Sequence, residues 1–274
     1  MSHFTVGVIT KDYPIYNKID ALLAPYDENK EVEHFISKEE LIAEERQNFE
    51  DYKNGTYAKY LADPEAYKAN CTNPKHIFYL EQEFPKKFEW TDEDFYKEAL
   101  QYVADEDVMP DGSVRSMYNP NSKWDWWEIG GRCSGLLMTK DGQQANTLPI
   151  KEIANLYDKE KEADAKKFCE IFVEGSTDYS EGEIKEVMSR AFYKKEYLLK
   201  IYKTKENYIK CCCSLATYAL LIEGKEWEAK GEMCYFGISD EENGAEIKWL
   251  ERMTEVLTNP DYQDYFLTVV DCHI

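Results

Sequence analysis

The chain has 274 residues, of which 43% are hydrophobic and 14% aromatic. This is too apolar for a disordered protein and long enough for one large domain or two modest ones. The 33 Lys and Arg against 54 Asp and Glu give a formal net charge of −21. Because nucleic-acid backbones and anionic membranes both attract positive faces, the charge argues against direct binding to either.

Targeting signals and metal motifs are not predicted. The first residues contain no basic leader followed by an apolar stretch, and no window is apolar enough for a membrane helix, so we expect a cytoplasmic protein. The eight cysteines include no C-x-x-C pair, and the four histidines are scattered. We therefore expect reduced thiols, no metal site and no cofactor.

Strand-like and helix-like segments alternate unevenly along the chain. Apolar and β-branched runs predict strands over residues 4–9, 76–80, parts of 126–138, 208–222, 232–236 and 266–274. Apolar periodicity predicts helices over residues 15–23, 38–52, 92–104, 148–167, 183–203 and 245–257. Capping boxes begin three of these helices, at Ser37, Thr91 and Ser180. A turn at 223–225 predicts a hairpin between the strands at 208–222 and 232–236.

The order of the elements predicts an α+β fold. Strands at both ends of the chain favour a mixed or antiparallel sheet that contains the first and the last strand. We expect residues 1–139 and 206–274 to form an α+β core domain. The helical residues 140–205 are expected to form a subdomain or an insertion.

The densest segment lies between residues 118 and 135, where three of the six tryptophans fall within four positions. Aromatic walls with cations can hold a nucleotide by stacking and phosphate pairing. A glycine pair permits a close backbone approach or a positive φ. The candidate ligand-binding residues are Lys123, Trp124, Asp125, Trp126, Gly130, Gly131 and Arg132.

A structural interpretation of the same segment stays open. Trp124, Trp126 and Trp127 would then be core and edge residues of a strand. Asp125 and Arg132 would form a buried ion pair that fixes the turn. Neither glycine belongs to a known phosphate-binding loop, because the segment has no G-x-G-x-x-G or Walker pattern.

The last strand offers candidate acid–base residues. Asp271 and His273 are two positions apart, so their side chains share one face of a strand. If the first strand lies beside the last, His3 comes near them. Such an acid–histidine group is suited to general acid–base catalysis. The alternative is an ordinary sheet end with polar residues.

Acidic runs are the remaining feature. Most such runs are solvated helix faces. They can also imitate a phosphate array and occupy a basic groove of a partner protein. The candidate partner-binding residues are Asp92, Glu93, Asp94, Glu98, Asp105, Glu106 and Asp107.

Four separated motifs resemble a family of hypothetical proteins common in bacteriophages and prophages. They are SHFTV at 2–6, LAPYDEN at 23–29, NPNSKWDW with IGGR at 119–126 and 129–132, and TVVDCHI at 268–274. Cys133 departs from the pattern, in which an aromatic residue is expected after the arginine. The resemblance implies a mobile-element origin and a bacterial host cell, and it transfers no catalytic residues.

Two functional hypotheses follow. The first is a phage-encoded acidic protein, without enzymatic activity, that binds and inhibits a host defence or nucleic-acid-processing complex. The second is a nucleotide-recognising protein, either an enzyme or a sequestering binder, that uses the tryptophan-rich segment. The expected partner is thus a host protein, or a nucleotide.

Overall fold

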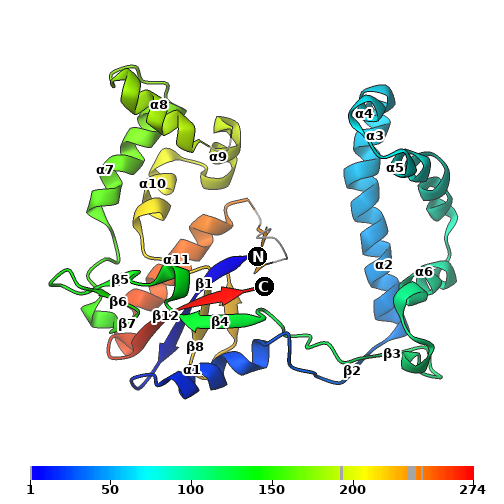
Figure 1. Cartoon of the computed structure of the whole chain (residues 1–274), viewed down its shortest axis with the longest axis horizontal. Coiled ribbons are helices and arrows are strands. Elements are labelled where there is room, and N and C mark those ends of the chain that lie inside the picture. Colours follow the sequence, from blue (N-terminus) through cyan, green and yellow to red (C-terminus); the bar gives the residue numbers. More distant parts are fainter. Residues whose placement is uncertain (1, 192–193, 234–238, 242) are drawn as a thin grey trace. The chain divides into compact units, whose positions relative to one another are not determined.

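The computed structural model describes residues 2–191, 194–233, 239–241 and 243–274 (Figure 1). The chain forms two compact units. The larger contains Met1–Lys30 and Asn121–Ile274, and the smaller contains Glu31–Pro120. These boundaries differ from the expected ones: residues 140–205 lie within the larger unit, and a separate unit is formed by a segment that was expected to belong to the core domain.

A mixed six-stranded sheet organises the larger unit. Its strands are β1 (His3–Thr10), β4 (Trp126–Ile129), β7 (Thr147–Pro149), β8 (Ala219–Ile222), β9 (Trp227–Ala229) and β12 (Phe266–His273). Their order is β4-β12-β1-β8-β9, and β7 also pairs with β12. β1 and β8 are parallel, whereas the other pairs are antiparallel. The α+β fold with the first and last strands in one mixed sheet is therefore confirmed.

The sheet is built on the long pairing of β1 with β12. All eight residues of β1 pair with β12, from His3 opposite His273 to Thr10 opposite Phe266. Successive side chains alternate between the two faces. Phe4, Val6 and Val8 are buried on one face, and Ile9 is buried on the other.

One helix packs against each face of the sheet. α11 (Ala245–Thr258) contributes Trp249 and Met253 to the cluster that contains Ile9. α1 (Tyr16–Leu23) contributes Ile19 and Leu23 to the cluster that contains Val6. Both helices are as the sequence predicts, because each has one clear apolar stripe.

The middle of the larger unit is helical and has its own small core. It comprises α7 (Lys159–Phe168), α8 (Glu181–Arg190), α9 (Lys195–Tyr202) and α10 (Lys205–Cys213), with a π-helical turn over Cys169–Val173. Phe168, Ile171, Val187 and Leu198 are buried together there. The capping box at Ser180 is present, as predicted.

Three sequence predictions in this region are wrong in detail. The helix expected from 148 begins at Lys159, because residues 147–149 pair with β12 as β7 and Asp158 caps the helix. The helix expected over 183–203 is divided between α8 and α9. The first part of the strand expected over 208–222 is the end of α10. The N-cap of this helix is Thr204, whose side-chain oxygen accepts a hydrogen bond from the backbone N–H of Asn207.

The hairpin after β8 forms at the predicted turn, with Gly224 at φ +81°, but its second strand is β9 rather than 232–236. The described part of that segment forms β10 (Glu232–Met233), which pairs with β11 (Ser239–Asp240), and residues 234–236 lie outside the described residues. A further short pair joins β5 (Leu137–Met138) and β6 (Gln144–Ala145).

The smaller unit is mostly helical. It contains α2 (Lys38–Tyr52), α3 (Ala58–Ala62), α4 (Pro64–Asn70), α5 (Pro74–Phe78) and α6 (Asp92–Ala99), together with β2 (His34–Ile36) paired to β3 (Val114–Ser116). The predicted capping boxes at Ser37 and Thr91 both form. The strand expected over 76–80 is wrong, because Asn73 caps α5 and Pro74 occupies its first turn.

Candidate functional site

Polar side chains gather at one end of the central sheet. In the register, His3 lies opposite His273, which lies opposite Trp126 on β4. Asp271 lies two residues before His273 and therefore on the same face. Figure 1 shows β1, β12 and β4 side by side, with both ends of the chain near this edge. The expectation that His3 comes near Asp271 is confirmed.

Each histidine is held by a carboxylate. His3 Nδ1 lies 3.0 Å from Asp271 Oδ1, and His273 Nδ1 lies 2.5 Å from Asp125 Oδ1. The two imidazole centroids are 5.1 Å apart, with the ring planes inclined by 68°. The side chains of His3 and His273 are only 17% and 14% exposed, so both are mostly shielded from water.

Asp271 is also held from the other side by a tight turn. The turn Gly131–Cys133 follows β4, and the Arg132 backbone N–H donates to Asp271 Oδ2 over 2.8 Å. Gly131 has φ +47°, and a Cβ there would lie 2.5 Å from Asp271 Oδ2. The glycine thus permits the close approach that the sequence predicts, and the approaching group is the protein's own carboxylate.

Gly130 has the same role towards a different side chain. Its φ is +75°, and a Cβ there would lie 2.3 Å from Asn146 Nδ2. Asn146 Oδ1 in turn accepts the Gly135 N–H over 2.7 Å. The glycine pair therefore fixes a turn between Asp271 and Asn146.

The three tryptophans of the segment have different environments. Trp124 is 5% exposed and donates its indole N–H to the Leu23 carbonyl over 3.2 Å. Trp127 is 7% exposed, and its ring stacks on Tyr16 with centroids 4.8 Å apart. Trp126 is 48% exposed, with its centroid 6.4 Å from that of His3. Two of them are core residues, and Trp126 alone of the three lies exposed beside the histidines.

The ion pair expected between Asp125 and Arg132 does not form. Asp125 binds His273, whereas the Arg132 side chain is exposed and makes no ion pair with any described residue. The reason is geometric, because the two residues flank opposite ends of β4.

Lys123 lies apart from this group. Its Nζ is 3.3 Å from Glu232 Oε1, and it lines a cavity of about 280 Å³ with Phe4, Tyr218 and other residues. Phe4 belongs to the face of β1 opposite to His3. The sequence prediction that Lys123 and Arg132 act on one ligand is therefore not supported by their positions.

Glu28 is a member of the site that the sequence analysis missed. Burial, reinforced by the nearby Asp125 and Asp27 carboxylates, raises the pKa of Glu28, and His273 partly offsets this. Its Oε2 is buried without a hydrogen-bond partner among the described residues, as is His273 Nε2. The only sequence signal for Glu28 was its place in the LAPYDEN motif.

The predicted acidic surface is largely neutralised where the structure describes it. In the smaller unit Asp92 pairs with Arg46, Glu93 with Lys38, Glu98 with Lys87 and Asp107 with Arg115, while Asp94 completes the capping box of Thr91. Asp105 and Glu106 are exposed and form no ion pair with the described residues. Their role in partner binding stays a prediction.

The carboxylates orient the two imidazoles. A carboxylate at Nδ1 favours the tautomer that carries the proton there, which leaves Nε2 as the hydrogen-bond acceptor. At His273 this second nitrogen is buried. A role of these residues in general acid–base catalysis stays a prediction.

The described residues contain neither a metal-binding cluster nor a membrane-spanning helix. No group of three or more His, Cys, Asp and Glu side chains there is arranged to hold a metal ion. No helix in the described ranges has the length and apolar content needed to cross a membrane. In the comparisons with known proteins, no family model, no curated protein and no solved structure matches this chain.

Proposed function

We propose that the protein recognises a nucleotide at the end of the sheet where His3, His273 and Trp126 lie in one row. The observation that carries this proposal is the pair of imidazoles, each anchored by a carboxylate and 5.1 Å apart, next to an exposed indole. A nucleotide combines the two groups that these residues bind well, a phosphate and a planar base.

The phosphate is assigned to His3 and to Arg132. An imidazole N–H donates a hydrogen bond to a phosphate oxygen, and the arginine fork forms charge-assisted pairs with phosphate oxygens. The Arg132 backbone N–H donates to Asp271 over 2.8 Å, and Asp271 also binds His3, so Arg132 belongs to the same end of the sheet.

The base is assigned to Trp126. Its ring is 48% exposed although the neighbouring Trp124 and Trp127 are buried. Base stacking on an aromatic side chain contributes roughly 1–3 kcal/mol. The exposed indole beside His3 is therefore the surface that we assign to the base.

Calorimetric titration with the four ribonucleoside monophosphates and a dinucleotide tests the proposal, with phosphorus NMR on the same mixtures to detect cleavage. We expect binding that weakens at least tenfold in Trp126→Ala and in Arg132→Ala. Lys140→Ala, which removes an exposed cation eight residues after Arg132, is the matched control and should bind normally. The absence of binding to the folded wild type would contradict the proposal.

The smaller unit supports a second candidate, an acidic protein that inhibits a host defence or nucleic-acid-processing complex. Residues 31–120 carry 21 Asp and Glu against 10 Lys and Arg, so the negative charge is concentrated there. The same unit exposes apolar side chains, with Phe35 at 55% and Tyr102 at 91%. Exposed aromatic side chains are enriched at protein interfaces, and acidic residues can steer association with a basic partner.

Affinity capture from bacterial host lysate tests this candidate. The charge-reversing variant Asp105→Lys/Glu106→Lys changes two exposed acids that form no ion pair in the described part of the unit, and it should lose the captured protein. Glu226→Lys/Glu251→Lys makes the same change in the larger unit and is the control. Equal capture by both variants would contradict an acidic docking surface at residues 105–106.

A further inference from the structure

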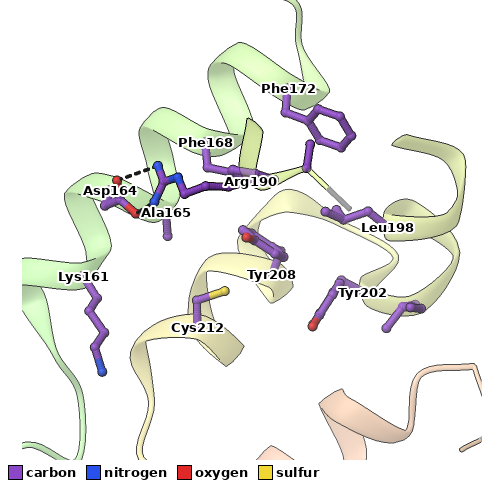
Figure 2. A pocket seen from close by; sticks show the side chains of 12 residues that line it. Lys161, Asp164, Ala165, Phe168, Phe172, Arg190, Leu198, Tyr202, Tyr208 and Cys212 are labelled. Carbon is purple, nitrogen blue, oxygen red and sulfur yellow. Dashed lines mark hydrogen bonds and ion pairs between the residues drawn. The ribbon is translucent and has the colours of Figure 1, made fainter. Parts of the chain in front are cut away.

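We infer that the helical part of the larger unit contains a binding site for a small, uncharged aromatic molecule. A cavity of about 410 Å³ lies between α7, α9 and α10 (Figure 2). Its size is within the range of small-molecule sites in proteins. It belongs to different elements from the histidine site, so the inference does not depend on the nucleotide proposal.

The walls of the cavity are mainly aromatic. Phe168 and Tyr208 stack with centroids 5.4 Å apart, and Tyr202 meets Tyr208 edge to face at 5.1 Å. Phe172 extends this wall from Phe168, with centroids 5.2 Å apart. Figure 2 shows these rings around the cavity, together with Leu198. Aromatic walls arranged in this way offer both a face and an edge to a planar ligand.

Three polar groups in the cavity wall are neutral. Burial raises the pKa of the Tyr202 and Tyr208 hydroxyls well above the ordinary value, and it raises the pKa of the Cys212 thiol as well. All three therefore keep their protons near neutral pH. Hydroxyls in such a site can donate a hydrogen bond to a ligand without charge.

The charges that line the cavity already have partners. Arg190 forms two hydrogen bonds with Asp164, at 2.9 and 3.0 Å, and Figure 2 shows this pair beside the aromatic wall. Lys161 Nζ lies 3.5 Å from Asp158 Oδ2. A charged ligand would lose its hydration without gaining a free counter-charge, so the cavity favours an uncharged one.

Three bicyclic probes that differ in charge test this inference: 1-naphthol, 1-naphthoate and 1-naphthylmethylammonium. We expect the full-length protein to bind 1-naphthol at neutral pH at least tenfold more tightly than either ion, as measured by fluorescence titration. Magnetisation transfer between the bound naphthol and the ring protons of Tyr202 or Tyr208 should locate it in the cavity. Equal or tighter binding of either ion, no binding of 1-naphthol at 1 mM, or contacts to rings elsewhere would overturn the inference.

Two variants fill the cavity. Cys212→Phe adds a ring at a lining position on α10, and Ala165→Leu adds volume at a buried lining position on α7. Each should weaken 1-naphthol binding at least tenfold. Met188→Phe is the control, because Met188 is 51% exposed on α8 and does not line the cavity. Circular dichroism identifies which variants are folded, and unchanged affinity in a folded filling variant would overturn the inference.

Discussion

His3 and Asp271 are separated by 268 positions in the sequence, and their side chains meet at 3.0 Å on adjacent strands. The carboxylate is only 1% exposed and also accepts the Arg132 N–H. One buried group thus joins the first strand, the last strand and the turn after β4. This connection links the stability of the sheet end to the geometry of the candidate site.

Asp271→Ala should lower the free energy of unfolding by about 2–3 kcal/mol, because it leaves the Arg132 N–H and the His3 ring without their buried acceptor. Urea denaturation followed by circular dichroism measures the change. Glu128→Ala is the control, because Glu128 lies opposite Asp271 in the sheet but is exposed. A loss in the control equal to that in Asp271→Ala would mean that the buried contacts do not matter.

Asp271→Asn should shift the proton on His3. The carboxylate favours a proton on Nδ1, whereas an amide N–H facing that nitrogen favours a proton on Nε2. Ring ¹⁵N chemical shifts distinguish the two tautomers directly. The same tautomer in both proteins would show that Asp271 does not orient the ring, whatever its contribution to stability.

Gly131→Ala should destabilise the protein by about 3 kcal/mol or more. A Cβ at position 131 would lie 2.5 Å from Asp271, and the alanine would have to adopt φ +47°. Gly142→Ala separates the two effects, because Gly142 has φ +83° with no atom within 4 Å of the added Cβ. Gly142→Ala should lose only the stability that the strained backbone costs, roughly 1–2 kcal/mol. Thermal and urea denaturation of both variants measure the difference.

The elements predicted correctly are those whose local pattern agrees with their tertiary environment. β1 and β12 are apolar and β-branched and lie at the centre of the sheet, and α11 presents one apolar stripe to it. The capping boxes at Ser37, Thr91 and Ser180 formed because each depends on residues three positions apart. Such local signals can be identified in the sequence without knowledge of the fold.

The wrong predictions arose where apolar composition was given more weight than helix caps. Residues 76–78 and 208–213 contain β-prone side chains, but Asn73 with Pro74 and Thr204 begin helices before them. The strand β7 was missed because a strand of three residues is too short to show an alternation of apolar and polar side chains. Its identity depends on pairing with β12, more than a hundred residues away.

The candidate site likewise contains contacts that the sequence predicts and contacts that it does not. His3 with Asp271 was predictable, because both lie on clear strands that were expected to be neighbours. Asp125 with His273 was not, because their meeting depends on the register between β4 and β12. Glu28 carried no chemical signal in the sequence, and its membership of the site follows from burial and from neighbouring charges.

The pairing of Glu228 with Arg252 should make stability depend on pH in the acid range. Two hydrogen bonds of 2.7 and 2.8 Å from Arg252 lower the pKa of Glu228 below its ordinary value of 4.5. A carboxyl with a lowered pKa stabilises the folded chain above that ordinary value, and the contribution is lost as the pH falls through the folded pKa. Glu228→Gln should therefore be less stable than the wild type at pH 7, with a difference that shrinks below pH 4.5.

Urea denaturation at a series of pH values measures this difference. Glu226→Gln is the matched control, because Glu226 is exposed and forms no ion pair within the described ranges. Its stability should differ from that of the wild type by a small amount that does not change with pH. A constant difference between Glu228→Gln and the wild type from pH 7 to pH 3 would contradict the proposed contribution.

Trp124 and Trp126 should respond in opposite ways to replacement by alanine. Trp124 is 5% exposed and its indole N–H is bonded to Leu23, so Trp124→Ala should cost about 3–5 kcal/mol of unfolding free energy. Trp126 is 48% exposed, so Trp126→Ala should cost less than about 1 kcal/mol. Nucleotide binding by the folded proteins should show the reverse order, with the larger loss in Trp126→Ala, because only its ring is open to a stacked base. A Trp126→Ala variant that binds nucleotide normally would assign all three tryptophans of the segment to the framework and leave the histidine pair without its proposed base-binding neighbour.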